Sequence, residues 1–487
     1  MLNQQKKSQR NFKLTPLSIA ICAAVLSPTA LFAQDQTETA QETEDNILEI
    51  IEVSARKKVE SIQDIPMSVT AVPAKLIRDM GLNDLKEISK YVPGLERPNS
   101  VLQSRMAIRG VSSGDNWSFE QAVGTYVDGV YRGRMNQLRA GFFDMERIEV
   151  LKGPQVTLYG NSSIGGAISM ISKAPTNALE GEINLRYETQ YQETDFTGAL
   201  NVPITDDFAI RLAGKIRKDG KGLSINQATG EDEPKSDDSA FRISSRWNIN
   251  DNWTANLKME QSTTRVDGNF LDVFKHVNGD GTPFEPSPYT GVGDNELNVT
   301  NGDFFKPDGT FWENKSNDVS LQIDYTNDAF SFVSITAMSE YDYTQSADID
   351  VTPLPIANTF NNEAYEQFSQ EFRIANELNE STDYILGVYY QNDEIDHDYY
   401  ADFNVPLILA ASTGLPLGTL SNLISPFSRH LSLVQDTSQW AIFANIDHEF
   451  SDHWEGSFGL RYLNMDKTAD QAVNLQHNLS QFRFDLH

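Results

Sequence analysis

From about residue 180 onward the sequence alternates between apolar and polar residues, and this period of two constrains the fold more than any other feature. Ile183, Leu185 and Tyr187 alternate with polar or charged residues, and Phe208–Leu212 and Trp454–Tyr462 repeat the pattern. Successive side chains of a strand point to opposite faces of a sheet, so each segment predicts a strand with one apolar face and one polar face. This part of the chain is therefore expected to be all-β.

The predicted strands are joined alternately by short turns and by long loops. The short turns, rich in acidic and amide residues, are Thr205–Asp207, Asn250–Asn252, Asn327–Ala329, Asn379–Thr382 and Ser451–His453. The long polar loops are Asp219–Ser239, Arg265–Thr310 and Asn392–Gln435. Short turns at one end and long loops at the other are typical of a transmembrane barrel whose apolar face meets lipid. A soluble sandwich is the alternative, but it would need its apolar faces to meet each other.

We can place about eleven strands of roughly ten residues each between residues 178 and 487, whereas the large barrels with a filled interior close with about 22 strands. An open edge in lipid would leave backbone groups unpaired, at several kcal/mol each. The segment Gln471–His487 also lacks the terminal aromatic residue that is usual on the last strand of such barrels. We therefore expect the sequence to cover only the N-terminal part of a barrel.

The stretch Arg147–Ser172, RIEVLKGPQVTLYGNSSIGGAISMIS, follows a different pattern. It begins as an alternating strand, breaks at a Gly-Pro pair and then places glycines among small residues, which predicts tight turns with positive φ. These residues are Gly153, Pro154, Gly160, Gly165 and Gly166. A phosphate-binding loop is the competing interpretation, but no Lys-Ser or Lys-Thr pair follows the last glycine.

This stretch resembles the plug-domain signature of TonB-dependent outer-membrane receptors, which usually reads close to RIEVLKGPQGTLYGRNAIGGAINI. Two upstream segments, Ile108–Val111 and Val123–Tyr131, resemble further plug motifs in the expected order. Besides the glycines and proline above, the motif residues are Arg109, Gly110, Asp128, Gly129, Arg147 and Glu149. Val156 stands where the family usually has Gly, and Asn161 where it usually has Arg. These departures leave the local turn, and the contact made by that arginine, open.

The resemblance implies an α/β plug domain, which we place at residues 59–176, before the barrel at 178–487. The pattern within the plug predicts a strand at Ser68–Val72 and then a helix in which Leu76, Ile77 and Met80 share a face. We expect Asn83 to cap a second helix that buries Leu85 and Ile88. A tight hairpin is expected on the Asp128-Gly129 pair.

Three segments precede the plug. Residues 1–33 combine a basic start with an apolar run too short to span a bilayer, which predicts a secretory signal peptide. Residues 34–58 are expected to be a disordered leader. Within it, a β-prone patch is either the first strand of the plug or, as its position favours, a TonB box that a partner captures as an added strand. The box residues are Ile50, Ile51, Glu52, Val53, Ser54 and Ala55.

Composition excludes several other classes. The net charge of −30 argues against nucleic acid as a partner, because nucleic-acid binders present basic faces. The one cysteine, Cys22, lies in the predicted signal peptide, so a disulfide scaffold or a cysteine-based metal site is not expected. The histidines are scattered, and His448-Glu449 with His453 has one residue too many for a zinc-protease helix. We expect no catalytic set, no metal site and no cofactor.

The function implied by the resemblance is TonB-coupled uptake of a scarce ligand, most often a ferric siderophore, across the outer membrane of a Gram-negative cell. The expected partners are TonB, outer-membrane lipid and the ligand. Cobalamin, haem or saccharide receptors remain alternatives, which aromatic loop residues such as Phe304, Phe305, Phe311 and Trp312 would suit equally well. A barrel that only binds at the surface, such as an adhesin, is an alternative from another class.

The resemblance also implies contacts between plug and barrel. In that family, arginines of the two plug motifs face glutamates on the barrel wall, which maps Arg109 and Arg147 onto the plug side. Alternation places Phe372 and Ile374 on one face of their strand, so Glu371 is expected to point inward as a partner.

Overall fold

The computed structural model describes residues 52–97, 105–114, 120–139, 141–225, 230–268, 309–348, 356–379, 381–414, 416–424, 426–451, 453–477 and 480–486, apart from residues 55, 59 and 64. The chain divides into two compact units, Met1–Glu49 and Ile50–His487, and all described residues belong to the second. The predicted signal peptide and most of the predicted leader lie outside the described residues. Within those residues, no helix combines the length and the apolar character needed to cross a membrane.

The plug is built on a five-stranded sheet in the order β3-β9-β10-β7-β8. The strands are β3 Ser68–Pro73, β7 Val123–Val127, β8 Val130–Arg132, β9 Met145–Lys152 and β10 Gly166–Ser172. β10 pairs antiparallel with β9 and parallel with β7, so the glycine-rich connector between β9 and β10 is a compact reversal. The predicted strand, break and second strand are confirmed.

Two short helices, α1 Ala74–Asp79 and α2 Leu85–Ser89, contribute to the plug core. α2 buries Leu85 and Ile88, as predicted. Its cap is Asp84, not Asn83, because the Asp84 carboxylate accepts a hydrogen bond from the Glu87 amide. The shared face predicted for α1 is wrong: only Ile77 is buried, since the helix is short and its other apolar residues face outward.

Smaller elements complete the plug. β1 Glu52–Val53 pairs with β2 Glu60–Ser61, and β4 Leu95–Glu96, β5 Ala107–Ile108 and β6 Val111–Ser112 form a three-stranded sheet. Single helical turns lie at η2 Met135–Leu138, α3 Val156–Tyr159 and η3 Asn161–Ser163.

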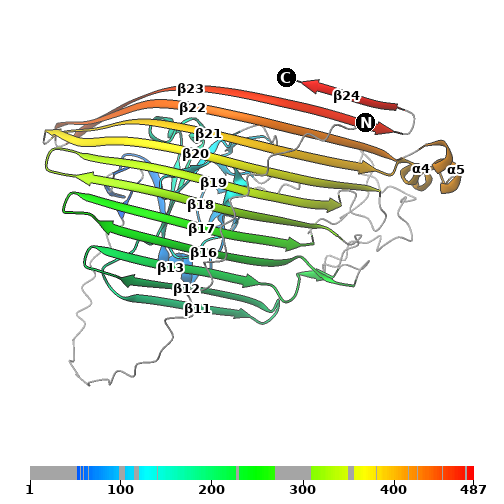
Figure 1. Ribbon diagram of the computed structural model, residues 1–487, viewed down its shortest axis with the longest axis horizontal. Helices are drawn as coiled ribbons and strands as arrows, with labels where there is room; N and C mark the ends of the chain where they lie inside the picture. The colour runs from blue at the N-terminus through cyan, green and yellow to red at the C-terminus, as the bar shows by residue number, and fades with distance from the viewer. Residues whose placement is uncertain are drawn as a thin grey trace, which may run out of the picture. The chain divides into compact units, whose positions relative to one another are not determined.

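Twelve of the described strands form one antiparallel sheet, which we call the barrel sheet, in plain sequence order (Figure 1). The strands are β11 Glu180–Glu188, β12 Glu193–Pro203, β13 Phe208–Lys218, β16 Lys235–Asn248, β17 Trp253–Asp267, β18 Phe311–Thr326, β19 Ser331–Asp348, β20 Ala357–Asn379, β21 Thr382–Phe403, β22 Phe427–Ser451, β23 Trp454–His477 and β24 Ser480–Leu486. The five predicted short turns all fall between neighbouring strands at one end of this sheet.

The opposite end carries the longer connections. A small hairpin of β14 Ser224–Ile225 and β15 Asp232–Glu233 lies before β16, and the helices α4 Val405–Thr413 and α5 Leu417–Leu423 lie between β21 and β22. The predicted loop Asn392–Gln435 is therefore too long, because β21 runs on to Phe403 and β22 begins at Phe427. β16 likewise begins at Lys235, inside the predicted loop Asp219–Ser239, and β17 runs to Asp267.

The strand estimates need two corrections. The barrel sheet has one strand more than expected, and its strands grow from 9 residues in β11 to 25 in β22. About ten residues suffice for a strand to cross a bilayer, and the longer strands exceed this length. Towards the end of β21, Ile395 is buried on the inner face while Glu394 is exposed. The apolar and polar positions have exchanged faces there, and this exchange hid the strand ends in the sequence.

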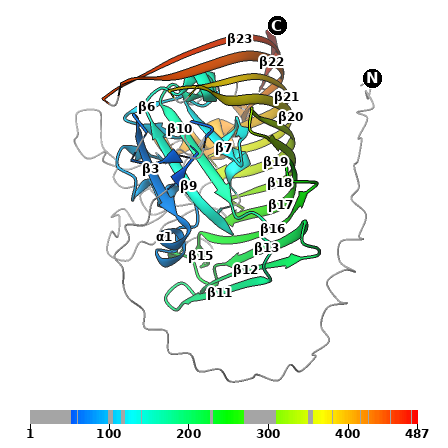
Figure 2. The same ribbon diagram turned by 90° about the vertical axis from the view of Figure 1, so that its left-hand side faces the viewer.

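The two faces of the barrel sheet have opposite character, as the alternation predicts. Ile183, Phe458 and Trp454 are 77%, 70% and 75% exposed on the outer face, whereas charged residues such as Arg211 and Glu371 are buried on the inner face. Figure 2 shows the plug strands β3, β9, β10 and β7 on the concave side of the barrel sheet. The buried polar face therefore faces the plug, and the exposed apolar face points away from it.

Candidate functional site

The glycine-rich connector forms the densest turn of the plug. Gly153 and Gly160 have φ of 104° and 96°, and Gly166 has φ of 146°. A Cβ at Gly166 would lie 2.2 Å from the Leu151 carbonyl oxygen, so no side chain fits there. Gly165 is not among the positive-φ residues described, so its predicted turn geometry is wrong. Val156 begins α3, so the departure from the family pattern is accommodated by a helical turn.

The predicted Asp128-Gly129 hairpin joins β7 and β8, with φ of 48° and 79° at its two central residues. The Asp128 carboxylate accepts hydrogen bonds from Ser172 of the plug and from Lys258 on β17. Burial alone would raise the pKa of Asp128, but the charges of Lys258 and Arg242 and these hydrogen bonds outweigh it and hold the pKa at about 2. Asp128 thus joins the plug to the barrel sheet as an ionised group.

The two motif arginines do not meet Glu371. The Arg147 guanidinium binds Glu149 at 2.8 Å and also contacts Glu146, both within the plug. Arg109 has a left-handed backbone, with φ of 52°, and donates its amide to the Gly94 carbonyl at 2.7 Å. Gly110, with φ of 80°, continues this turn. These residues shape the plug itself, because their positions on the strand and turn direct them to plug neighbours.

Glu371 contacts the plug through Lys57. The Lys57 ammonium lies 2.8 Å from both carboxylate oxygens of Glu371, and Arg373 on the same strand lies 2.9 Å from one of them. The position of Glu371 on the inner face is as predicted, but its expected arginine partners are wrong. The left-handed turn at Lys57, with φ of 60°, brings this lysine to the wall.

The predicted TonB box lies partly outside the described residues, which include Glu52, Val53 and Ser54 but not Ile50, Ile51 or Ala55. Glu52 and Val53 form β1, the first strand of the plug. Val53 is fully buried in a cluster that contains plug residues and, from the barrel sheet, Ile385 and Phe443.

Ser54 donates its amide to Glu149 at 2.8 Å, so the motif residue Glu149 fastens this segment. Residues 56–58 are also packed, and the leader predicted to end at residue 58 therefore overlaps the folded plug.

Other ion pairs between plug and barrel sheet were missed by sequence reasoning. The Arg211 guanidinium binds Asp144 through two hydrogen bonds of 2.7 and 2.5 Å, with both side chains 5% exposed. Arg132 of β8 pairs with Asp318 of β18, also in a buried position. Alternation could have shown that Arg211 and Asp318 face inward, but no sequence signal shows which plug residue each one meets.

The η2 turn holds the side of the plug that faces β17–β20. The Gln137 amide group donates to Ser339 at 2.9 Å, and Asn136 donates to Glu363 at 2.9 Å. The Arg139 guanidinium lies over the rings of Trp312 and Tyr343, 4.4 and 4.7 Å from their centroids. Trp312, proposed above as a loop residue for ligand, thus lies on a strand against the plug, and its expected neighbours Phe304 and Phe305 lie outside the described residues.

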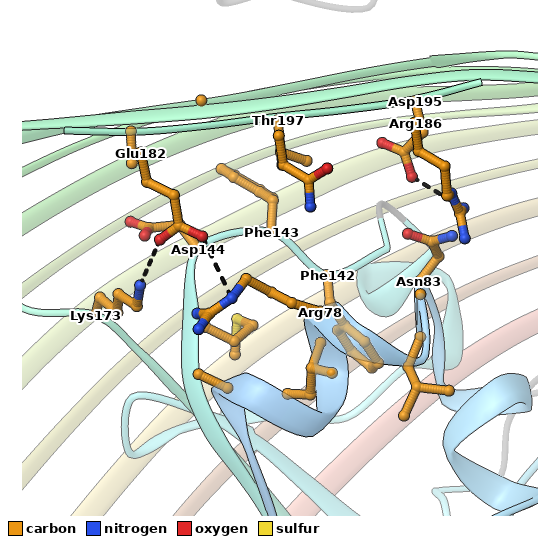
Figure 3. A pocket seen from close by; sticks show the side chains of 18 of the residues that line it. Arg78, Asn83, Phe142, Phe143, Asp144, Lys173, Glu182, Arg186, Asp195 and Thr197 are labelled. Carbon is orange, nitrogen blue, oxygen red and sulfur yellow. Dashed lines mark hydrogen bonds and ion pairs between the residues drawn. The ribbon is translucent and has the colours of Figure 1, made fainter.

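A pocket of about 100 Å³ separates the plug from β11–β13 (Figure 3). The Glu182 carboxylate forms ion pairs with Lys173 at 2.9 Å and with Arg78 at 3.4 Å. Arg186 forms an ion pair with Asp195 at 3.2 Å. The space is wide enough for several water molecules. The plug thus meets β11 and β12 across a charged, open seam, whereas β13 and β17–β22 also make buried contacts with it.

Comparison with known proteins finds similarity to one family of receptors. Residues 61–167 match the model of the TonB-dependent receptor plug domain. The pesticin receptor of Yersinia enterocolitica is 32% identical over 230 residues, which are 45% of this chain and 32% of that receptor. The ferrioxamine receptor of the same species is 31% identical over 206 residues, 40% of this chain and 27% of that receptor. The aligned parts thus span about a third of these relatives.

Solved structures show the same architecture. The ferric yersiniabactin uptake receptor of Yersinia pestis superposes with a TM-score of 0.67 and 21% identity over 86% of this chain and 60% of that chain. The ferripyoverdine receptor of Pseudomonas aeruginosa superposes with a TM-score of 0.64 and 13% identity over 89% of this chain and 55% of that chain. The plug of this chain is thus similar to the plug domain of TonB-dependent receptors, and the chain shares its fold with the solved receptors.

Proposed function

We propose that the protein takes part in energised uptake of a ferric siderophore across the outer membrane of a Gram-negative cell. The observation that carries this proposal is a folded plug held on the polar concave face of a barrel sheet whose outer face is apolar. Such an outer face suits lipid, and a plug inside it blocks free diffusion. In a closed barrel, a ligand could pass only if the plug moved.

The contacts between plug and barrel sheet are consistent with a plug that shifts within the barrel during uptake. Beside smaller apolar clusters, they include many ion pairs and hydrogen bonds, such as Arg211 with Asp144 and Gln137 with Ser339. Polar contacts can be exchanged for water when the plug shifts, whereas a continuous apolar interface would resist hydration. The charged seam beside β11–β13 gives water a place to enter.

We propose residues 50–55 as the segment that TonB captures. A partner that adds this segment as a strand to its own sheet would bind its backbone and could pull on it. Because Val53 and Ser54 are packed against the plug and hydrogen-bonded to Glu149, a pull on this segment would act directly on the plug core.

The test is iron uptake in iron-starved cells that lack their own copy of the gene and carry either the wild-type protein or the Ile51→Pro variant. Proline removes a backbone donor from the captured strand, so transport of ferric siderophore should be lost while surface binding is kept. Ile51→Ala keeps the donor and is the matched control, with transport expected to persist. Normal transport by Ile51→Pro would refute the assigned segment.

A panel of ligands distinguishes the proposed cargo from its alternatives. Ferric yersiniabactin, ferrioxamine, haem and cobalamin are supplied in turn, and the rate of uptake is compared with that of cells without the gene. The relatives include a ferrioxamine receptor and a hemin receptor, 30% identical over 170 residues in the latter case. Uptake of cobalamin or haem alone would overturn the siderophore assignment, and surface binding without any uptake would favour a passive receptor.

A further inference from the structure

Lys57 carries its ammonium into one of the most enclosed positions between plug and barrel sheet. The Lys57 and Glu371 side chains are each 8% exposed, and the nitrogen lies 2.8 Å from both carboxylate oxygens. The same nitrogen lies 5.8 Å from the ring centroid of Tyr159 and 5.1 Å from that of Phe443. The lysine therefore ties the segment after β1 to strands β20 and β22 at once.

The neighbours of Lys57 in sequence tie the same segment to the short-turn end of the barrel sheet. Lys58 lies 2.7 Å from Asp383 at the start of β21. Arg56 lies 3.3 Å from Asp447 on β22 and 3.5 Å from Glu455 on β23. The pairs of Lys58 with Asp383 and of Arg56 with Glu455 involve a partly exposed group, so each contributes little by itself. The Arg56 and Asp447 side chains are 10% and 8% exposed, so this pair is nearly as enclosed as that of Lys57 with Glu371.

Positive charge is in excess around Glu371. Arg373 shares this carboxylate, and Arg461 on β23 stacks over Phe443 with its guanidinium carbon 5.3 Å from the ring centroid. A small cavity of about 30 Å³, lined by Lys57, Glu371 and Arg461 among others, has room for roughly two water molecules. Lys57 is thus buried beside two other cations, and the adjoining cavity has room for water.

We propose that Lys57 is a latch biased toward release: it anchors residues 52–61 to the barrel wall, while the cost of burying its charge keeps the docked and released states of this segment close in free energy. The latch goes beyond the proposed function, because it concerns docking of the segment whatever the ligand is.

The titration of Lys57 supports this view. Burial lowers the pKa of Lys57 from 10.5 to about 8; Glu371 opposes this effect, and the charges of Arg373 and Arg461 add to it. The released lysine would regain its ordinary pKa, so between pH 8 and 10.5 the released segment holds more protons than the docked one. Raising the pH through this window therefore favours docking.

Other groups around Lys57 leave this window clear. Ordinary carboxyl and guanidinium groups do not titrate between pH 7 and 10. Burial raises the pKa of Tyr126 and Tyr159 well above 10, so these hydroxyls stay neutral. The groups that face the lysine are Glu371, Arg373, Tyr389 and Arg461 from the barrel sheet and Glu120, Tyr126 and Tyr159 from the plug.

The experiment measures hydrogen exchange of the β1 and β2 amides in the purified protein, corrected for the intrinsic effect of pH. Because the released segment binds more protons than the docked one, we expect the protection of these amides from exchange in the wild type to rise more than about tenfold between pH 7 and pH 9.5. Lys57→Met keeps the apolar stem without the charge, and Arg373 still pairs with Glu371. Its protection should be independent of pH and, at pH 7, more than about tenfold above that of the wild type.

Two further variants separate charge from packing. Lys57→Arg stays charged throughout, so its protection should remain low and independent of pH. Glu371→Gln leaves Lys57 buried without its carboxylate and should lower protection at pH 7. Amides of β9 and β10 report whether each variant keeps a folded plug. Wild-type protection that is flat or falls with pH, or a Lys57→Met segment that is less protected than the wild type, would overturn the latch.

Discussion

Gly166 offers the sharpest test of how the plug signature shapes the fold. It begins β10 with φ of 146°, opposite Lys152 of β9. A Cβ there would lie 2.2 Å from the Leu151 carbonyl oxygen and 2.8 Å from the Ile108 Cδ1 atom. The oxygen is backbone and cannot rotate away, so Gly166→Ala must push β9 and β10 apart.

The magnitude follows from two separate costs. A side chain in this backbone region costs about 1–3 kcal/mol in strain. Forcing an extra carbon into a packed site costs about 1–3 kcal/mol more. We therefore expect Gly166→Ala to lower the free energy of opening the β9–β10 pair by about 2–6 kcal/mol.

Gly153→Ala is the matched control. This glycine lies in the same connector with φ of 104°, but the nearest atom to its added Cβ is the Arg109 side chain at 3.8 Å, an ordinary contact. It should show only the strain of about 1–3 kcal/mol. Native-state hydrogen exchange of the β9 and β10 amides measures both opening energies. If Gly166→Ala costs no more than Gly153→Ala, the close approach to Leu151 is not what excludes a side chain.

Three other predictions concern the contacts between plug and barrel sheet and the long-loop end. Asp144→Asn should weaken plug docking in urea by about 3–5 kcal/mol, because Arg211 is left buried without its carboxylate; the double change with Arg211→Met should cost less than the two single changes added together. The pKa of Asp128 lies below its ordinary value of 3.8, so its contribution is present above pH 4 and is lost as the pH falls toward 2; Lys258→Met should raise the pH at which acid releases the plug to proteases. Replacing residues 269–308 by a short turn should abolish ligand binding with little effect on sheet assembly, since loop length costs folding little; a variant that fails to assemble yet binds ligand would show that this end is not the binding end.

Much of the fold could be read from local patterns. The alternation at Ile183–Tyr187 and Trp454–Tyr462 assigns each side chain to the inner or outer face, and the exposed fractions agree. This works because a strand has a side-chain period of two, whatever its neighbours are. The Gly153-Pro154 break and the Asp128-Gly129 turn could also be predicted from the sequence, because a positive φ depends on only one or two residues.

Local patterns were less reliable at element ends. The cap of α2 shifted by one residue to Asp84, and β21 and β22 ran well into a predicted loop. In the later part of β21, Glu394 is exposed on the outer face and Ile395 is buried on the inner face, so the apolar and polar positions exchange faces. If apolar residues are expected on the outer face along the whole strand, the predicted strand therefore ends too early.

The sequence by itself determined which residues face the plug, where the chain turns tightly and which family its plug resembles. The tertiary structure decided which charged side chains of the plug and of the barrel sheet form ion pairs. Lys57 and Glu371 are 314 residues apart, and Arg132 and Asp318 are 186 apart. Periodicity shows which face of its strand a side chain lies on, but it does not show how the plug packs against the sheet. The pairing of Glu371 with Lys57, and not with Arg109 or Arg147, depends on how the plug packs against the sheet, because an ion pair requires two groups from distant parts of the chain to lie within a few ångströms.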